Sequence, residues 1–194
     1  MIAESSQLET RLKGLVRVPE DDLARALLFF TPVFFKKTEY LLSQDQVSNQ
    51  LYFINSGLVK SYLLQDGKEH IRQFAAENDF IVDLQSFLSR QKTSFFIQAL
   101  EDTAALAISF DNLNMLFESS FHFMKLGKTL ADQSAISLIR RSVSLVKDDA
   151  KKRYADFMKE RPGLVQRVPQ FMIASYLGIT PESLSRIRKE MVHG

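Results

Sequence analysis

The sequence predicts an α+β protein in which a small β-barrel or jelly roll precedes a long helix and a C-terminal helix-turn-helix. Three observations support this fold class. Between residues 33 and 110 short β-type runs alternate with turn residues, and between residues 121 and 146 a helical pattern continues without proline. Residues 168–189 then have the pattern of two short helices around a tight turn.

Residues 4–30 have the apolar spacing of helices. Leu8 and Leu12 lie one helical turn apart, and the acidic residues 20–22 are typical of a helix start, because carboxylates stabilise the positive end of a helix. We expect this helical region to end at Thr31, since the residue before a proline is displaced from the α region.

The region from residue 33 to residue 110 is expected to form the barrel, because many short strands at near-regular spacing are typical of small β-barrels and jelly rolls. Asp66-Gly67 predicts a hairpin, since both residues tolerate a positive φ. Residues 83–90 interrupt the pattern with one or two helical turns. The expected strands are Val33–Leu41, Gln50–Ile54, Leu58–Leu64, His70–Ala75, Ser94–Leu100 and Ala104–Phe110.

Composition excludes several classes of protein. The 194 residues are 45% hydrophobic, which is enough to bury a core, and the absence of cysteine excludes disulfides, thiolate zinc sites and cysteine-ligated iron–sulfur clusters. No apolar run approaches the roughly 18 residues of a membrane span, and the N-terminus lacks the layout of a signal peptide. We therefore expect a cytoplasmic protein with no membrane partner.

Two neighbouring apolar stripes run along the helix expected over residues 121–146. Together they are wider than one barrel is expected to cover, so they predict a homodimer in which the helix meets its copy. The alternative is an ordinary buried helix. The residues expected at the dimer seam are Ala135, Leu138, Ile139, Ser142, Val143 and Val146.

The C-terminal region carries local signals for two helices joined by a turn. Gly178 can adopt the left-handed conformation that ends a helix, and Thr180 is a good N-cap before Pro181 at the first helical position. Leu184 and Ile187 then share one face of the second helix and can pack on the first helix.

The opposite face of that second helix carries Glu182, Ser185, Arg186 and Lys189 at helical spacing. Arginine pairs with the guanine edge and a carboxylate accepts from the cytosine amine, so this face suits the DNA major groove. Residues 138–194 also hold 12 lysines and arginines against 6 aspartates and glutamates. The alternative is a helical hairpin with a solvated charged face. The residues expected at DNA are Gln170, Thr180, Pro181, Glu182, Ser183, Ser185, Arg186, Arg188 and Lys189.

This order of helix, glycine-punctuated barrel, long helix and helix-turn-helix resembles the Crp/Fnr family of bacterial transcription regulators. The most specific segments are residues 51–59 and residues 173–186, and residues 152–157 are similar to the family's hinge. The resemblance implies a homodimer, an effector in the barrel, double-stranded DNA and RNA polymerase as partners, and Glu182 with Arg186 as the base-reading pair. It implies three parts: residues 1–120 as helices and barrel, 121–147 as the dimerisation helix, and 148–194 as the DNA-binding domain.

The sequence departs from the family pattern in two places. Members that bind cyclic nucleotide carry a Gly-Glu pair and an Arg-Ser/Thr-Ala run around the ribose and phosphate. Here residues 77–84 lack that pair and phenylalanine stands near the arginine position, so we expect no cyclic AMP binding in the family's usual way. No cofactor is predicted. The chain also ends soon after the recognition helix, which predicts a reduced or absent wing. The expected effector pocket comprises Phe80, Asp83, Leu84, Phe87, Phe95, Phe96 and Ser137.

Two other functions remain as alternatives. A ligand-binding barrel that does not bind DNA would need none of the polar residues on the second C-terminal helix. A cupin-like enzyme would need two or three histidines and a carboxylate around one metal ion. The three histidines, His70, His122 and His193, lie in three different segments, so neither a metal site nor an enzyme is expected.

Overall fold

The computed structural model describes the backbone of residues 2–193 and the side chains of residues 5–191. The chain divides into two compact units. The first contains Met1–Leu63 and Gln73–Gln133, and the second contains Leu64–Arg72 and Ser134–Gly194. None of the helices in the described part of the chain combines the length and hydrophobicity that crossing a bilayer requires.

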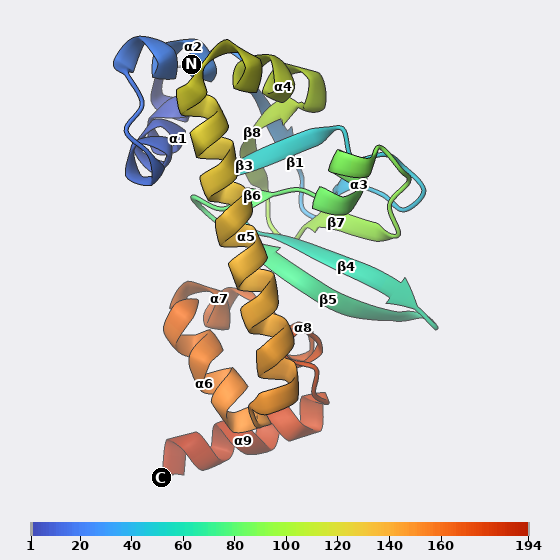
Figure 1. The fold of residues 1–194 in the computed structure, drawn as a ribbon. Helices are drawn as coiled ribbons and strands as arrows, with labels where there is room; N and C mark the ends of the chain where they lie inside the picture. The colour runs from blue at the N-terminus through green and yellow to red at the C-terminus, as the bar shows by residue number, and fades with distance from the viewer. Residues whose placement is uncertain (1, 194) are drawn as a thin grey trace. The chain divides into compact units, whose positions relative to one another are not determined.

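Two four-stranded antiparallel sheets form the predicted jelly roll, which confirms the fold class (Figure 1). Their cores meet in a cluster of buried side chains that includes Ile54 from one sheet and Ile97 from the other. The first sheet has the order β1 (Thr31–Phe35), β8 (Thr103–Ser109), β3 (Gln50–Ser56) and β6 (Phe80–Ile81). The second has the order β2 (Tyr40–Leu42), β7 (Phe95–Ala99), β4 (Val59–Gln65) and β5 (Lys68–Ala75).

Helices cover the other face of the first sheet. Because side chains alternate along a strand, Phe53 points away from the space between the sheets while Tyr52 points into it. Phe53 is fully buried against Leu8 and Phe123, which come from helices far apart in the sequence. The helices of this layer are α1 (Ile2–Leu15), α2 (Glu20–Leu27), α4 (Phe110–Ser119) and the first turns of α5 (Phe121–Lys147).

The structure corrects one predicted strand and adds another. The prediction of a single strand over Val33–Leu41 is wrong, because a turn separates β1 from β2. Thr38 has a φ of 76° there, and the Asp102 carboxylate accepts the backbone N–H of Lys37 at 2.9 Å. The two-residue strand β6 was not expected. The hairpin at Asp66-Gly67 is confirmed, with φ values of 51° and 72°.

The predicted helices differ from the structure at the end of the first helical region. The helical turns expected at residues 83–90 form α3 (Leu84–Ser89). Thr31, expected to end a helix, already belongs to β1, because α2 ends at Leu27. Pro162 stands between two helices. It follows α6 (Ala150–Glu160) and opens a short helix α7 (Pro162–Arg167), at the position where its missing N–H costs no hydrogen bond.

The second unit has a separate core around the helix pair α8 (Gln170–Leu177) and α9 (Pro181–His193). Tyr154 and Phe157 of α6 are buried in this unit, and the Phe157 ring lies 5.5 Å from that of Tyr176. Asp149 caps α6 by accepting the backbone N–H of Lys152 at 2.7 Å.

The tip of the β4–β5 hairpin, Leu64–Arg72, belongs to this second unit. The Ser175 hydroxyl donates to the Glu69 carbonyl at 2.8 Å and accepts the backbone N–H of Ile71 at 3.0 Å. The Arg141 guanidinium lies 3.9 Å from the Tyr176 ring centroid and donates to the carbonyls of Tyr176 and Ile71. Ser175 and Arg141 therefore give the edge of β5 the hydrogen-bond partners that an edge strand otherwise lacks.

Candidate nucleic-acid interface

The turn between α8 and α9 requires a glycine. Gly178 has φ 67° and ψ 36°, the left-handed conformation that favours glycine, and its N–H donates to the Ser175 carbonyl at 3.1 Å. A Cβ at this position would lie 3.2 Å from the Leu145 side chain. The predicted role of Gly178 as the end of the first helix is confirmed.

The start of α9 is fixed by the residues that the sequence indicated. Thr180 Oγ1 accepts the backbone N–H of Ser183 at 3.2 Å, which satisfies one of the free donors in the first turn. Pro181 is the first residue of the helix. The Thr180 cap sets the residue at which α9 begins. It therefore helps to set which side chains of α9 face outward.

Packing fixes the rotation of α9. Leu184 and Ile187 are buried with Ile173 and Ala174 of α8, and Ala174 has no exposed surface. The residues on the opposite side of α9 remain exposed to solvent. They are Glu182, Ser185, Arg186 and Lys189.

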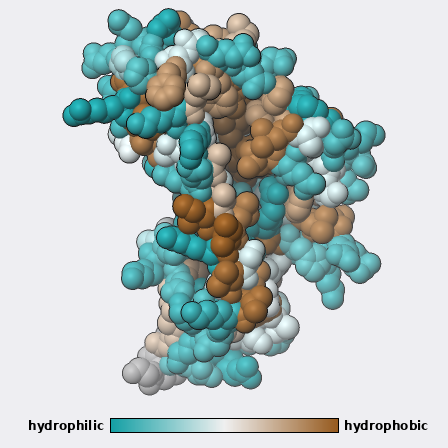
Figure 2. All heavy atoms as spheres, viewed as in Figure 1, coloured by the Kyte–Doolittle hydropathy of each residue, from teal (hydrophilic) through white to brown (hydrophobic). Residues whose placement is uncertain are grey.

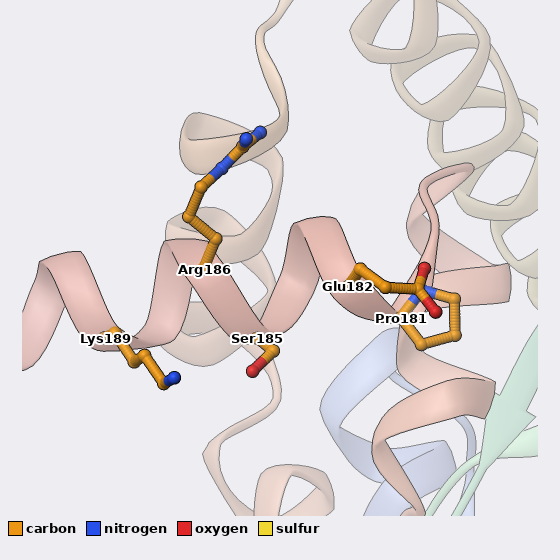
Figure 3. A pocket seen from close by; sticks show the side chains of 5 residues that line it. All are labelled: Pro181, Glu182, Ser185, Arg186 and Lys189. Atoms are coloured by element: carbon orange, nitrogen blue, oxygen red, sulfur yellow. The ribbon is translucent and has the colours of Figure 1, made fainter.

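These exposed side chains and Pro181 line an open hollow of about 510 Å³ along α9. Figure 3 shows the Glu182 carboxylate beside Pro181 at the start of the helix and the Arg186 side chain extended away from the helix axis. Among the described residues, neither Arg186 nor Lys189 has a hydrogen bond or ion pair. Both cations are therefore available to an external anion or base edge.

Glu182 is held in its ionised form. Its own backbone N–H, and then the nearby Thr180 hydroxyl, stabilise the negative charge and lower the pKa of the carboxyl below its usual value. The hollow thus presents one carboxylate beside two cations at neutral pH, which is the mixture of acceptor and donors that base edges require.

The other residues predicted at DNA lie on the same helix pair. Gln170 is exposed as the first residue of α8, and Ser183 and Arg188 are half-buried on α9. All nine predicted residues therefore belong to the α8–turn–α9 segment. Their contact with DNA stays a prediction.

The predicted dimer seam is exposed in the single chain. Ile139 is 63% exposed and Val146 is 90% exposed, and hydrophobic side chains gather along the C-terminal half of α5 (Figure 2). The alternative of an ordinary buried helix is wrong for this half of α5, since residues 131–140 are all exposed. The remaining predicted seam residues are exposed as well: Ala135, Leu138, Ser142 and Val143.

Three of the predicted effector residues pack against other aromatic rings. The Phe80 ring packs 5.1 Å from Phe53, the Phe87 ring packs 5.2 Å from Phe110, and the Phe96 ring stacks 5.1 Å from Tyr62. These rings already contribute to three separate packing sites. Of the other residues, Phe95 lies on the opposite face of β7 from Phe96, Leu84 is exposed on α3, and Ser137 is exposed on α5 in the second unit.

Asp83 is only 2% exposed, and its carboxylate accepts a hydrogen bond from the Thr93 hydroxyl. Thr93 also accepts the backbone N–H of Phe95 at 2.9 Å. A buried carboxylate therefore stands in the segment where phosphate-binding members of the resembled family place their nucleotide contacts. Within the described residues, no group of three histidine, aspartate or glutamate side chains has an arrangement that could hold a metal ion.

Sequence reasoning missed Ser175 and Arg141, which hold the hairpin tip. Their partners lie 70 to 106 residues away in the sequence, and no local pattern marks such contacts.

Residues 32–120 match the cyclic nucleotide-binding domain family. No curated protein sequence matches the chain significantly.

Several solved structures share the fold. FixK2 from Bradyrhizobium japonicum is 22% identical, with a TM-score of 0.72, and the match covers 84% of this chain and 85% of FixK2. A CooA mutant from Carboxydothermus hydrogenoformans is 25% identical, with a TM-score of 0.65 over 87% of this chain and 79% of CooA. CLP, a c-di-GMP-responsive global regulator from Xanthomonas campestris, is 16% identical, with a TM-score of 0.67 over 90% and 92% of the two chains.

Proposed function

We propose that this chain, which has the fold of Crp/Fnr-type regulators and a cyclic nucleotide-binding domain at residues 32–120, is a homodimeric transcriptional regulator that binds DNA. The observation that carries the proposal is the orientation of α9. Leu184 and Ile187 anchor one face of this helix, and the opposite face presents a carboxylate, a hydroxyl and two unpaired cations to solvent.

The two ends of the exposed face have different roles in this proposal. Arg186 donates two hydrogen bonds to the edge of a guanine, and Glu182 accepts a hydrogen bond from a cytosine amine. These two residues therefore read bases. Arg188 and Lys189 on α9, with Gln170 at the start of α8, contact backbone phosphates, which position the protein without specifying a sequence.

Dimerisation through α5 accounts for the exposed apolar stripe. Pairing of two copies removes Ile139, Val143 and Val146 from water, and burial of apolar area at about 25 cal/mol per Å² favours the dimer. A two-fold symmetric dimer would read a near-palindromic site whose half-site centres lie about 10 base pairs apart. RNA polymerase is the further partner expected of such a regulator.

The barrel is proposed not to bind cyclic AMP in the family's usual way. The phenylalanine near the position of the phosphate-binding arginine supports this, because a buried phosphate charge without an arginine partner is costly. Calorimetric titration with cyclic AMP and cyclic GMP checks this part of the proposal. A dissociation constant in the micromolar range for either nucleotide would contradict it.

Selection of bound duplexes from a randomised pool tests the DNA-binding function. The wild type should select a near-palindromic motif, and Arg186→Ala should lose the preference at one base position in each half-site. Arg17→Ala is the matched control, because it removes an exposed arginine from the first unit. If the wild type selected no motif and showed no salt-dependent DNA binding, a ligand-binding barrel without DNA binding would replace the proposal.

A further inference from the structure

The first unit contains a pocket that none of the predicted site residues lines. It has a volume of about 330 Å³ and opens on the first sheet, between β1, β3, β8 and the start of α4. A volume of this size lies at the lower end of the range of about 300–1,000 Å³ that small-molecule sites occupy.

Small residues on the central strand create the hollow. Ala107 of β8 lies in register between Thr31 of β1 and Tyr52 of β3, and Ser109 lies beside Gln50. Ala107 is only 6% exposed and has a single methyl group, so the larger residues on both flanking strands rise above it. The strand register therefore forms a trough with Ala107 and Ser109 as its floor.

Aromatic rings form a wall of the trough. The Phe35 and Tyr52 rings meet edge to face with centroids 5.8 Å apart. The Tyr52 hydroxyl donates to the Leu41 carbonyl at 3.2 Å, so this ring offers the pocket its carbon surface rather than its hydroxyl group. Such a wall favours the flat face or edge of another ring.

Polar groups at the trough are uncharged and have unused hydrogen-bonding capacity. Within the part of the chain that the structure describes, the side chains of Thr31, Gln50 and Asn112 have no hydrogen-bond partner. The Ser109 hydroxyl already accepts the backbone N–H of Asn112 at 3.2 Å. No aspartate, glutamate, lysine, arginine or histidine lines the pocket, so a charged ligand would find no counter-charge there.

We infer that this trough is a ligand site of the barrel, for a neutral, flat aromatic molecule with hydrogen-bond donors and acceptors on one edge. The ring packs over Ala107 against Phe35 and Tyr52. Its polar edge meets the amides of Gln50 and Asn112, which can both donate and accept. The site shares no residue with the α9 hollow, and its existence does not depend on DNA binding.

Two probes of the same shape test the ligand class on the full chain. 2-Naphthamide is neutral and has an amide edge, whereas 2-naphthoate is its anionic counterpart. Calorimetry and ligand-observed NMR should give a dissociation constant of about 1 mM or tighter for 2-naphthamide, as expected for roughly 13 non-hydrogen atoms. Binding of 2-naphthoate should be at least about tenfold weaker, because its charge has no partner.

Two substitutions locate the bound probe. Ala107→Leu fills the floor of the trough and should abolish binding, with thermal melting used to confirm that the variant folds. Asn112→Leu keeps the approximate side-chain volume but removes the amide, and should weaken 2-naphthamide by about 3- to 10-fold, the value of one hydrogen bond. Asn114→Leu, the same change on α4 at a residue that does not line the pocket, should leave binding unchanged.

Three kinds of result would overturn the inference, the third of them with either of two substitutions. The first is failure of 2-naphthamide to bind the wild type at concentrations of several millimolar. The second is equal binding of the amide and the carboxylate. The third is binding by a folded Ala107→Leu variant, or equal weakening by Asn112→Leu and Asn114→Leu.

Discussion

At the scale of single residues, Lys189 and Arg186 are both exposed cations on α9, yet the proposal gives them different roles. A lysine that contacts phosphate releases condensed counterions wherever it binds. We therefore expect Lys189→Ala to weaken binding to all duplexes similarly and to reduce the salt slope by about one unit. Fluorescence anisotropy at several salt concentrations, on the selected site and on a scrambled duplex, measures both effects.

Arg186→Ala, measured on the same two duplexes, is the control for Lys189→Ala. Loss of a bidentate arginine–guanine contact should cost about 1–3 kcal/mol on the selected site and much less on the scrambled duplex. A Lys189→Ala variant with the same sequence-dependent loss as Arg186→Ala would mean that the two side chains do not divide their roles as proposed.

Glu182 gives a prediction about pH. Its own backbone N–H and the Thr180 hydroxyl lower the pKa of the carboxyl, which means that folding favours the ionised form. This contribution to stability is present above the pKa of an unfolded glutamate and is lost as the pH falls through the lower folded pKa.

Carbon-13 NMR titration should therefore give a Glu182 midpoint below that of glutamate in a short unstructured peptide. Thr180→Val should raise this midpoint only part of the way toward the peptide value. The backbone N–H of Glu182, which is the larger cause of the lowered pKa, remains in this variant. Thr129→Val, an equivalent change on α5, should not move it. A Glu182 midpoint equal to the peptide value would contradict the charge stabilisation described for this side chain.

At the scale of elements, the turn between α8 and α9 depends on one glycine. Gly178→Ala should lower the free energy of unfolding by about 1 kcal/mol or more, because its φ of 67° is unfavourable for alanine and the new Cβ would lie 3.2 Å from Leu145. Urea denaturation measures the loss. Gly163→Ala is the matched control, since a Cβ there meets no atom within 4 Å and its φ is not positive. Equal effects of the two changes would argue against a special role for the turn.

The hairpin tip gives a second prediction at this scale. Ser175→Ala removes one hydrogen bond to the Glu69 carbonyl and one from the Ile71 N–H, each worth about 1 kcal/mol. Hydrogen exchange should accelerate at the Ile71 amide while amides in the core of the first unit are unaffected. Ser144→Ala on α5 is the control. Unchanged exchange at Ile71 in the Ser175 variant would show that this contact does not protect the strand edge.

Local signals explain why the C-terminal helix pair was predicted closely. The turn at Gly178 and the cap at Thr180 depend on residues a few positions away. The break between β1 and β2 was missed because it depends on Asp102, which lies 65 residues from its partner Lys37. The two-residue strand β6 is too short to show an alternating pattern.

The candidate sites also differ in how far local sequence signals predict them. The exposed face of α9 follows from helical spacing within one element, so its residues could be chosen from the sequence. The effector residues were chosen because aromatic residues stand where the resembled family has its phosphate-binding residues. In the structure the Phe80, Phe87 and Phe96 rings each pack against a different aromatic partner. The trough over Ala107 depends on the register of three strands, which only the structure provides.

At the scale of the whole molecule, the exposed stripe on α5 predicts the oligomeric state. Ile139→Asp with Val143→Asp should convert a dimer into monomers in sedimentation velocity, because like charges would face each other across the apolar seam. Gln91→Asp adds a negative charge at an exposed residue of the first unit and should leave the dimer intact. A wild type that sediments as a monomer at micromolar concentration would contradict the dimer.

The contact between the hairpin tip and Ser175 also has a consequence for synthesis. Glu69 leaves the ribosome 106 residues before Ser175 does. At about 5–20 residues per second, this separation corresponds to a delay of roughly 5–20 seconds. During that time the edge of β5 lacks Ser175, and it also lacks Arg141 until that residue is made, 70 residues after Ile71. Unpaired strand edges are where growing chains associate wrongly. Both partners of this edge are therefore made only after the whole of the hairpin has left the ribosome.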